Sequence, residues 1–262
     1  MIKRIAIIAF YVCIPLGVFV LLGFAVESNK SIPCRSFRVE VKDEGRFVDS
    51  AQVVRLVYSR MDTLQGRPIG DLSLKKIEEF ISAMYYVESA HVYRTIDGDV
   101  VANVRQRKPL ARVINSHNES FYIDRQGRLM KTSDSYTARV MIVTGHIPAR
   151  YSPHVVLEAN SPVKEEMTAS ENLLRELVKV IDYIHKDVFW NAWIDQVYVT
   201  RAGEFELIPK NGIHVIELGR ADELDEKFKK LMSFYRGGLM HTGWSSYNRI
   251  NLRFKNQIVC SK

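Results

Sequence analysis

Seven histidines and three cysteines are the side chains of this sequence best suited to acid–base, nucleophilic or metal chemistry. The histidines are dispersed, and none stands at a metal-ligand spacing from a cysteine or a carboxylate: His91, His117, His146, His154, His185, His214 and His241. The motifs H-E-x-x-H, G-x-S-x-G, C-x-x-C and the phosphate-binding loop do not occur. We therefore expect no catalytic, cofactor or metal site.

The cysteines give no disulfide framework either. Cys13 lies within an apolar run, and Cys34 and Cys260 stand alone near the two ends of the remaining chain. A Cys34–Cys260 bridge is the alternative to two free thiols. The formal net charge is +7, with lysines and arginines scattered rather than clustered. This pattern predicts a solvated basic surface, and the lack of interleaved basic and aromatic residues argues against a nucleic-acid partner.

The elements that hold these residues begin with an uncharged run, Ile5–Val26. As a helix it is expected to be about 33 Å long, enough to cross the ~30 Å hydrocarbon core of a bilayer. Lys3 and Arg4 precede it, which predicts a cytoplasmic stub at 1–4 and a bulk on the outer side of the membrane. The alternative is a cleaved signal peptide, but the run is long for one and ends without an A-x-A cleavage site. We expect an uncleaved membrane anchor that contacts lipid.

A polar tether at 27–36 leads into a first exported domain at 37–106. Alternation of apolar and charged residues in Phe37–Val41 predicts a half-buried strand. Asp49 and Ser73 are placed to cap two helices with apolar stripes, and a later Asp-Gly pair predicts a hairpin between two strands. The order strand, helix, helix, strand, strand predicts a small α+β domain with both helices on one face of a three-stranded sheet.

A second exported domain at 107–262 is predicted to be rich in strands. Short apolar or alternating runs recur between turn signals, of which an Asn-Gly pair is the strongest. Two helices interrupt them: one begins at a capping box, Thr168-Ala169-Ser170-Glu171, and one is predicted to begin at Asp222. The run Asn248–Cys260 alternates apolar and polar residues, so it is predicted to be the final strand, with an open sheet edge beyond it.

Five stretches of the sequence carry motifs whose order and spacing together are more specific than any one of them. They are Val87–Arg94, Val104–Ala111, Phe121–Gly127, Leu218-Gly219 with the Lys227-bearing helix, and Ile250–Phe254. Together with the predicted anchor and the predicted βααββ order, they resemble the bacterial cell-division family FtsQ/DivIB. Three positions depart from the family pattern: Gln106 stands where an acid is usual, Asn251 where Asp is common, and Phe254 where Tyr is common.

The resemblance implies a fold and a function. The fold is α+β: a single transmembrane helix, a POTRA domain (βααββ), and a mixed, β-rich domain with an open sheet edge at its C-terminal end. The function is that of a non-enzymatic scaffold of the division complex at the septum. The implied partners are FtsB and FtsL at the last strand of the β domain, with FtsW and FtsI reached indirectly or through the POTRA domain. The alternatives are a membrane-tethered envelope enzyme acting on the cell wall and a POTRA-type chaperone for outer-membrane proteins.

The resemblance also implies a partner site on the last strand and its flank. Its residues are Ile250, Leu252, Arg253, Phe254, Lys255, Asn256 and Gln257, with Trp244 and Tyr247 ahead of them. An edge strand offers unpaired backbone groups on which a partner strand can add. Strand alternation predicts that Arg253 and Lys255 point together toward carboxylates of a partner, while Phe254 supplies apolar area. The alternative is that these charges only protect the edge from aggregation.

Overall fold

The computed structural model of the 262-residue chain describes residues 16–17, 31–42, 46–153, 155–157, 168–211 and 214–262. The chain divides into two compact units, Met1–Gln106 and Arg107–Lys262. Within the described ranges, no helix is long and apolar enough to cross a membrane. The predicted anchor Ile5–Val26 lies outside those ranges except for Leu16 and Gly17, so the anchor stays a prediction.

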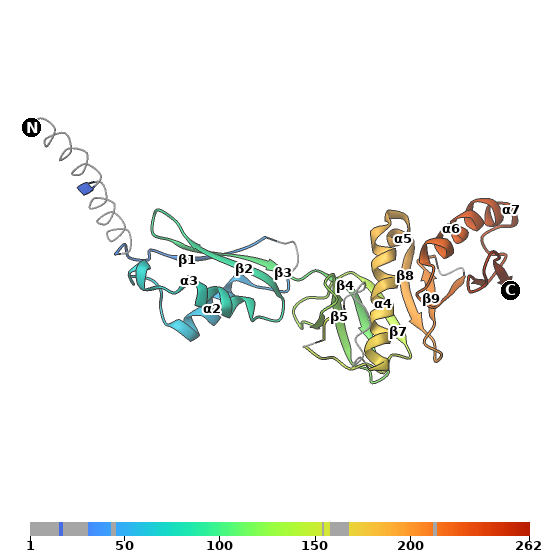
Figure 1. The fold of residues 1–262 in the computed structure, drawn as a ribbon, viewed down its shortest axis with the longest axis horizontal. Helices are drawn as coiled ribbons and strands as arrows, with labels where there is room; N and C mark the ends of the chain where they lie inside the picture. The colour runs from blue at the N-terminus through green and yellow to red at the C-terminus, as the bar shows by residue number, and fades with distance from the viewer. Residues whose placement is uncertain (1–15, 18–30, 43–45, 154, 158–167, 212–213) are drawn as a thin grey trace, which may run out of the picture. The chain divides into compact units, whose positions relative to one another are not determined.

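The N-terminal unit has the predicted order of strand, helix, helix, strand and strand. Its elements are β1 (Phe37–Val41), α2 (Ser50–Met61), the 3₁₀ turn η1 (Ile69–Asp71), α3 (Leu74–Ser82), β2 (Val87–Arg94) and β3 (Val100–Gln106). The strands form one sheet in the order β1-β3-β2, with β1 parallel and β2 antiparallel to β3. Both helices lie on one face of this sheet, which confirms the predicted arrangement (Figure 1).

Local signals account for the helices of this unit. The Asp49 carboxylate accepts a hydrogen bond from the backbone N–H of Ala51 at the start of α2. The Ser73 hydroxyl accepts one from Lys76 at the start of α3, so both predicted caps are confirmed. Residues at helical spacing fill the core beneath the sheet: Val53, Val57, Ile77 and Ile81.

The C-terminal unit is a nine-stranded mixed sheet with helices. Its elements are β4 (Pro109–Ile114), β5 (Ser120–Asp124), β6 (Leu129–Lys131), β7 (Met141–Gly145), α4 (Ala169–Lys186), α5 (Val188–Trp193), β8 (Ile194–Val199), β9 (Phe205–Pro209), β10 (Val215–Gly219), α6 (Leu224–Phe234), the π-helical turn η2 (Tyr235–Leu239), α7 (Met240–Thr242), β11 (Arg249–Asn251) and β12 (Val259–Ser261). The strand order is β12-β11-β10-β9-β8-β7-β4-β5-β6. The prediction of a mixed, strand-rich α+β unit is confirmed.

One face of this sheet is covered by α4 (Figure 1). The helix begins at the predicted capping box, where Thr168 and Glu171 satisfy each other's backbone N–H groups. Its apolar stripe packs on inward-facing strand residues such as Val143 and Val197. On the opposite face, alternate residues of β9 and β10 point outward, and these include Glu206 and Glu217.

Two predictions about this unit are wrong. Asn248–Cys260 is not one strand, because β11 ends at Asn251 and β12 returns antiparallel to it after a turn. The turn includes Asn256 with φ of 61°, a left-handed conformation that asparagine tolerates and that a continuous strand cannot contain. Asp222 does not cap α6 either, because its carboxylate accepts a hydrogen bond from the Lys227 ammonium instead.

Candidate functional site

The residues predicted to bind a partner occupy different environments around β11 and β12. Ile250 and Leu252 are 0% and 1% exposed and pack in the core. They support the segment from inside and present no side chain to a partner. The residues from Phe254 to Gln257 form an exposed turn between the two strands. β12 follows this turn as the outermost strand of the sheet among the residues described.

Arg253, which precedes the turn, is held by carboxylates of its own domain. One guanidinium nitrogen donates to Glu204 at 3.0 Å and another donates to Glu217 at 2.8 Å. The ammonium of Lys255 lies 4.0 Å from a different carboxylate, that of Glu223. The prediction that Arg253 and Lys255 point together is therefore wrong, and Arg253 already has the anionic partners that a bound peptide was expected to supply.

Glu217 is the centre of this polar network on the outer face of the sheet. Besides Arg253, its carboxylate accepts a hydrogen bond from Asn251 at 2.6 Å and another from Arg249. The guanidinium of Arg249 also pairs with Glu206. Charged side chains of β9 and β10 thus bind to residues of β11 and the segment after it. Because the three-residue β11 has few ladder hydrogen bonds, these side chains fix its position in the sheet.

Gly219, at the end of β10, gives the Arg253 side chain room to reach the network. Its φ is +77°, and a Cβ atom at this position would lie 2.7 Å from Cγ of Arg253. Lys227 stabilises the loop that follows, because its buried ammonium donates to the backbone carbonyl of Arg220 at 2.9 Å and to Asp222. The Leu-Gly and Lys positions noted in the sequence are thus structural supports of the terminal segment.

The exposed turn is also held from α6. The ammonium of Lys230 donates to the backbone carbonyl of Phe254 at 2.6 Å and to that of Leu252 at 3.3 Å. Burial lowers the pKa of Lys230. The side chain of Phe254 is 46% exposed, and that of Val259, on β12, is 44% exposed. The result is one exposed apolar side chain on a turn whose backbone is fixed by hydrogen bonds to a helix, and a second on the strand that follows.

Trp244 and Tyr247 pack against other aromatic rings of their own domain, unlike a fully exposed residue that is available to a partner. The Trp244 ring is 37% exposed, and its centroid lies 5.2 Å from that of Tyr235 and 5.7 Å from that of Trp193. Tyr247 is half-buried, with its ring 6.2 Å from Phe234. Both residues brace the segment between α7 and β11, and Trp244 retains one exposed edge that a partner can contact.

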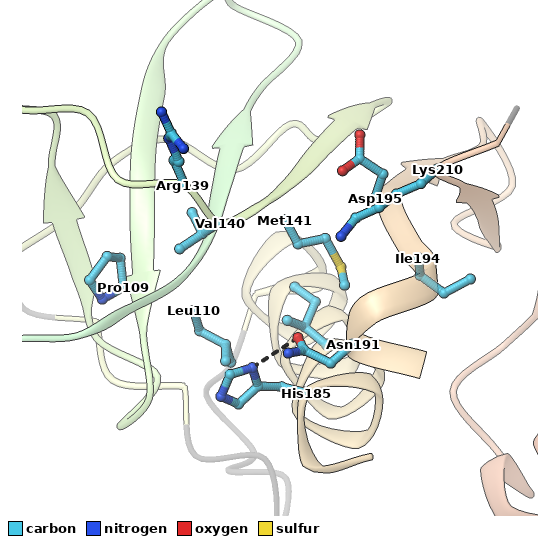
Figure 2. A pocket seen from close by; sticks show the side chains of 11 residues that line it. Pro109, Leu110, Arg139, Val140, Met141, His185, Asn191, Ile194, Asp195 and Lys210 are labelled. Atoms are coloured by element: carbon cyan, nitrogen blue, oxygen red, sulfur yellow. Dashed lines mark hydrogen bonds between the residues drawn. The ribbon is translucent and has the colours of Figure 1, made fainter. Parts of the chain in front are cut away.

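A separate pocket of about 390 Å³ opens where β4, β7 and β8 begin and α4 ends (Figure 2). Its lining includes Arg139, His185, Asn191, Asp195 and Lys210. Both ring nitrogens of His185 are engaged, one with Asn191 at 3.2 Å and the other with Arg125 at 3.0 Å. No serine, threonine or cysteine lines the pocket among the described residues, so it brings together polar groups without a hydroxyl or thiol nucleophile.

The remaining reactive groups are dispersed. Cys34 is buried and Cys260 is half-buried, and both are free thiols whose pKa is raised by burial. His214 is buried against the Tyr235 hydroxyl, with 2.7 Å between its Nε2 and that oxygen, and burial lowers the pKa of the imidazole. In the part of the chain that the structure describes, no group of three metal-ligating side chains comes together.

Sequence reasoning missed the residues that position the turn. Glu206 and Glu217 lie on β9 and β10, Glu204 directly precedes β9, and Lys230 lies on α6, all far from Arg253 in sequence or on another element. A signal was present, because Glu204 and Glu206 stand two residues apart and Arg249 and Arg253 stand four residues apart. Only the pairing of β10 with β11 brings the two sets together.

The fold is that of a two-domain α+β protein, with a βααββ domain followed by a mixed-sheet domain in which β12 is the outermost strand among the described residues. A family model described as a POTRA-like domain matches residues 32–105, and one described as FtsQ/DivIB, C-terminal related, matches residues 108–261. The chain belongs to the FtsQ/DivIB family, since the second match covers more than half of it. A similar protein is the cell division protein FtsQ of Rhodothermus marinus, 25% identical over 198 residues, which are 74% of this chain and 67% of the relative. The family predicted from the motifs is confirmed.

Proposed function

We propose that this chain acts in cell division as a non-enzymatic, membrane-anchored scaffold that recruits other division proteins. The division role is supported by the family and by the similarity to an FtsQ protein. The anchor Ile5–Val26 fixes the chain in the inner membrane, with residues 1–4 in the cytoplasm and the POTRA-like and β domains (37–106 and 107–262) in the periplasm at the septum.

The partner site in this proposal is the edge formed by β12 and the turn before it. One observation carries it: Phe254 is exposed on a turn that Lys230 fixes, and Val259 is exposed on β12, the outermost strand of the sheet among the described residues. A partner strand adds to β12 through backbone hydrogen bonds, and the two apolar side chains cover its inner residues. Lys255, which is 72% exposed, meets an acid of the partner.

The partners are FtsB and FtsL, which bind the edge of the β domain. FtsW and FtsI are reached through that complex or through the POTRA-like domain. Arg253 contributes by holding the turn, whereas Asn256 and Gln257 supply exposed backbone and amide groups. Trp244 contacts the partner through its exposed edge, and Tyr247 supports it.

The test is capture of FtsB and FtsL from membranes by the tagged full-length chain. Phe254→Ala and Lys255→Glu should each lower capture about tenfold, the loss expected for a central interface residue, while circular dichroism stays unchanged. Phe189→Ala is the matched control, because Phe189 is 40% exposed on α5 and lies outside the proposed site. Undiminished capture by both site variants contradicts the proposed site, and cleavage or joining of peptidoglycan by the purified chain contradicts a non-enzymatic role.

A further inference from the structure

The pocket of about 390 Å³ at the first residues of β4, β7 and β8 is lined by polar side chains that the domain leaves unpaired (Figure 2). Arg139, Asn191 and Lys210 can donate hydrogen bonds, and Asp195 is the one carboxylate in the lining. Within the described ranges, neither cation forms an ion pair, and the Asp195 carboxylate has no donor. The volume lies in the range of sites for small ligands. These groups are therefore available to a ligand.

His185 orients one of the donors. The guanidinium of Arg125 can only donate, so Nε2 of His185, 3.0 Å away, accepts, which an imidazolium could not do. The ring hydrogen then lies on Nδ1, which donates to the side-chain oxygen of Asn191 at 3.2 Å. The amide nitrogen of Asn191 keeps its hydrogens for another acceptor, since no described residue accepts from it. The neutral His185 ring itself adds no charge to the pocket.

The charges of the lining fit a ligand with a single negative charge. The two cations, Arg139 and Lys210, outnumber the carboxylate of Asp195 by one. Asp195 opposes a second negative charge on the ligand, but it can accept a hydrogen bond from a neutral N–H group. A carboxylate with an amide N–H nearby matches this arrangement, because it accepts charge-assisted hydrogen bonds from the cations and donates to the acid. A doubly charged phosphate matches it less well.

The same pocket has an apolar part that an inorganic anion would leave uncovered. Leu110, Ile181 and Ile194 belong to the lining, and all three are buried side chains of the core. Met141 lines the pocket beside them and packs against the core, and its unbranched side chain can adapt to different apolar shapes. A ligand whose anionic group is attached to an apolar side chain removes this surface from water. The pocket therefore favours an organic ligand over a free ion.

We propose that this pocket binds the C-terminal end of a peptide or protein whose last residue is apolar. The terminal carboxylate accepts hydrogen bonds from Lys210, Arg139 and the amide of Asn191. The last peptide N–H donates to Asp195, and the last side chain packs on the apolar part of the pocket. The site lies at β4, β7 and β8, whereas the proposed partner edge is β12, so each can fail without the other.

The probes are two fluorescent peptides with a free carboxylate, Gly-Ser-Gly-Ala-Leu and Gly-Ser-Gly-Ala-Val, titrated against the full-length chain in lipid nanodiscs and followed by anisotropy. The same peptides with a C-terminal amide should bind about tenfold more weakly, because they lack the charge that the cations bind. Lys210→Met removes the ammonium but keeps the length of the side chain, and it should weaken the free-carboxylate probes about fivefold. Lys229→Met, at an exposed lysine of α6, is the matched control and should bind them as the unmodified chain does.

Competition and a second variant identify what is bound and where. Inorganic phosphate in excess, at constant ionic strength, should not displace the probes, and Phe254→Ala should bind them normally. Circular dichroism of each variant checks that the chain is folded. Four outcomes overturn the proposal: no binding of either free-carboxylate probe, equal binding of the carboxylate and amide forms, equal losses in Lys210→Met and Lys229→Met, or a loss in Phe254→Ala, which would place the probes at the β12 edge. Displacement by phosphate would overturn it too, since the pocket would then bind a free anion.

Discussion

The network around Glu217 leads to a quantitative prediction about Arg253. It distinguishes a residue that stabilises the terminal segment from one that contacts a partner. If Arg253 holds the terminal segment in place, replacing it should destabilise the C-terminal unit with no partner present. If it is a free contact residue, as the resemblance implies, replacing it should affect partner binding alone. The perturbations are Glu217→Gln, Arg253→Met and the double variant, which together form a double-mutant cycle.

The structure sets the size of the effect. Arg253 loses two ion pairs on substitution, at 3.0 Å to Glu204 and 2.8 Å to Glu217. Its side chain is 44% exposed, so solvent screening reduces each pair to roughly 0.2–1 kcal/mol. The carboxylate of Glu217 is 16% exposed and is left with one fewer donor, which places the total for Arg253→Met at about 1–2 kcal/mol. The coupling energy between the two substitutions should be about 0.5–1 kcal/mol.

Tryptophan fluorescence can follow this unit within the full-length chain. The three tryptophans of the sequence, Trp190, Trp193 and Trp244, all lie in the C-terminal unit. Thermal unfolding of Arg253→Met should show a Tm lowered by roughly 3–6 °C, since about 1 kcal/mol shifts Tm by about 2–4 °C at this domain size. The difference should shrink in about 1 M salt, where the Debye length falls to about 3 Å. Lys255→Met is the control, and its Tm should stay near that of the unmodified chain.

The result that refutes this reasoning is a Tm for Arg253→Met equal to that of the unmodified chain, together with a coupling energy near zero. The guanidinium is then free in solution, and the ion pairs of Arg253 contribute nothing to stability. If the same variant also loses partner capture, Arg253 contacts the partner directly, as the resemblance implies.

Three further predictions test other parts of the structure. Burial lowers the pKa of the His214 imidazole below 6.5, so the unfolded chain binds a proton more readily than the folded chain does. The free energy of unfolding should therefore keep the full contribution of this group above pH 6.5 and should fall as the pH drops below it. In melts followed by tryptophan fluorescence, the fall should be smaller for His214→Gln. Gly219→Ala should lower the stability of the C-terminal unit by about 1–3 kcal/mol in denaturant titrations, because the new Cβ meets Arg253 and φ is +77°; a neutral result contradicts the packing described. A reporter active only in the cytoplasm, fused after Lys262, should be inactive in cells, and full activity would reverse the predicted topology.

Local signals were enough to predict the N-terminal unit. Asp49 and Ser73 cap helices whose apolar faces include the buried residues Val53 and Ile77. Each cap and each apolar pattern can be recognised within fewer than ten consecutive residues. The capping box at Thr168 was predicted for the same reason. Caps and hydrophobic periods depend on neighbours in sequence, so they can be read without knowledge of the tertiary fold.

The terminal segment could not be predicted in this way. Its alternation continues from Ile250 through Leu252, as in a strand, and nothing in the sequence marks the turn except Asn256. The pairing of Arg253 with Glu204 joins residues far apart in the chain, and it depends on the register between β10 and β11. A strand pattern alone therefore predicts that the Arg253 charge is available to a partner, although Glu204 and Glu217 already pair with it.

Because Arg253 is paired within its own domain, the terminal segment affects the free energy of partner binding in another way than a free charge would. A partner that must order a loose turn loses affinity to the entropy of that ordering, about 0.5–1.5 kcal/mol for each immobilised side chain. Here Lys230 holds the carbonyl of Phe254, and Arg253 holds the chain just before it, so the turn is ordered before a partner binds. In the proposed site, Arg253 then acts on binding through the position of Phe254, and its charge does not need to meet the partner. The charged residues of the motif hold the terminal segment, and the apolar side chains on the turn and on β12 are the proposed contacts.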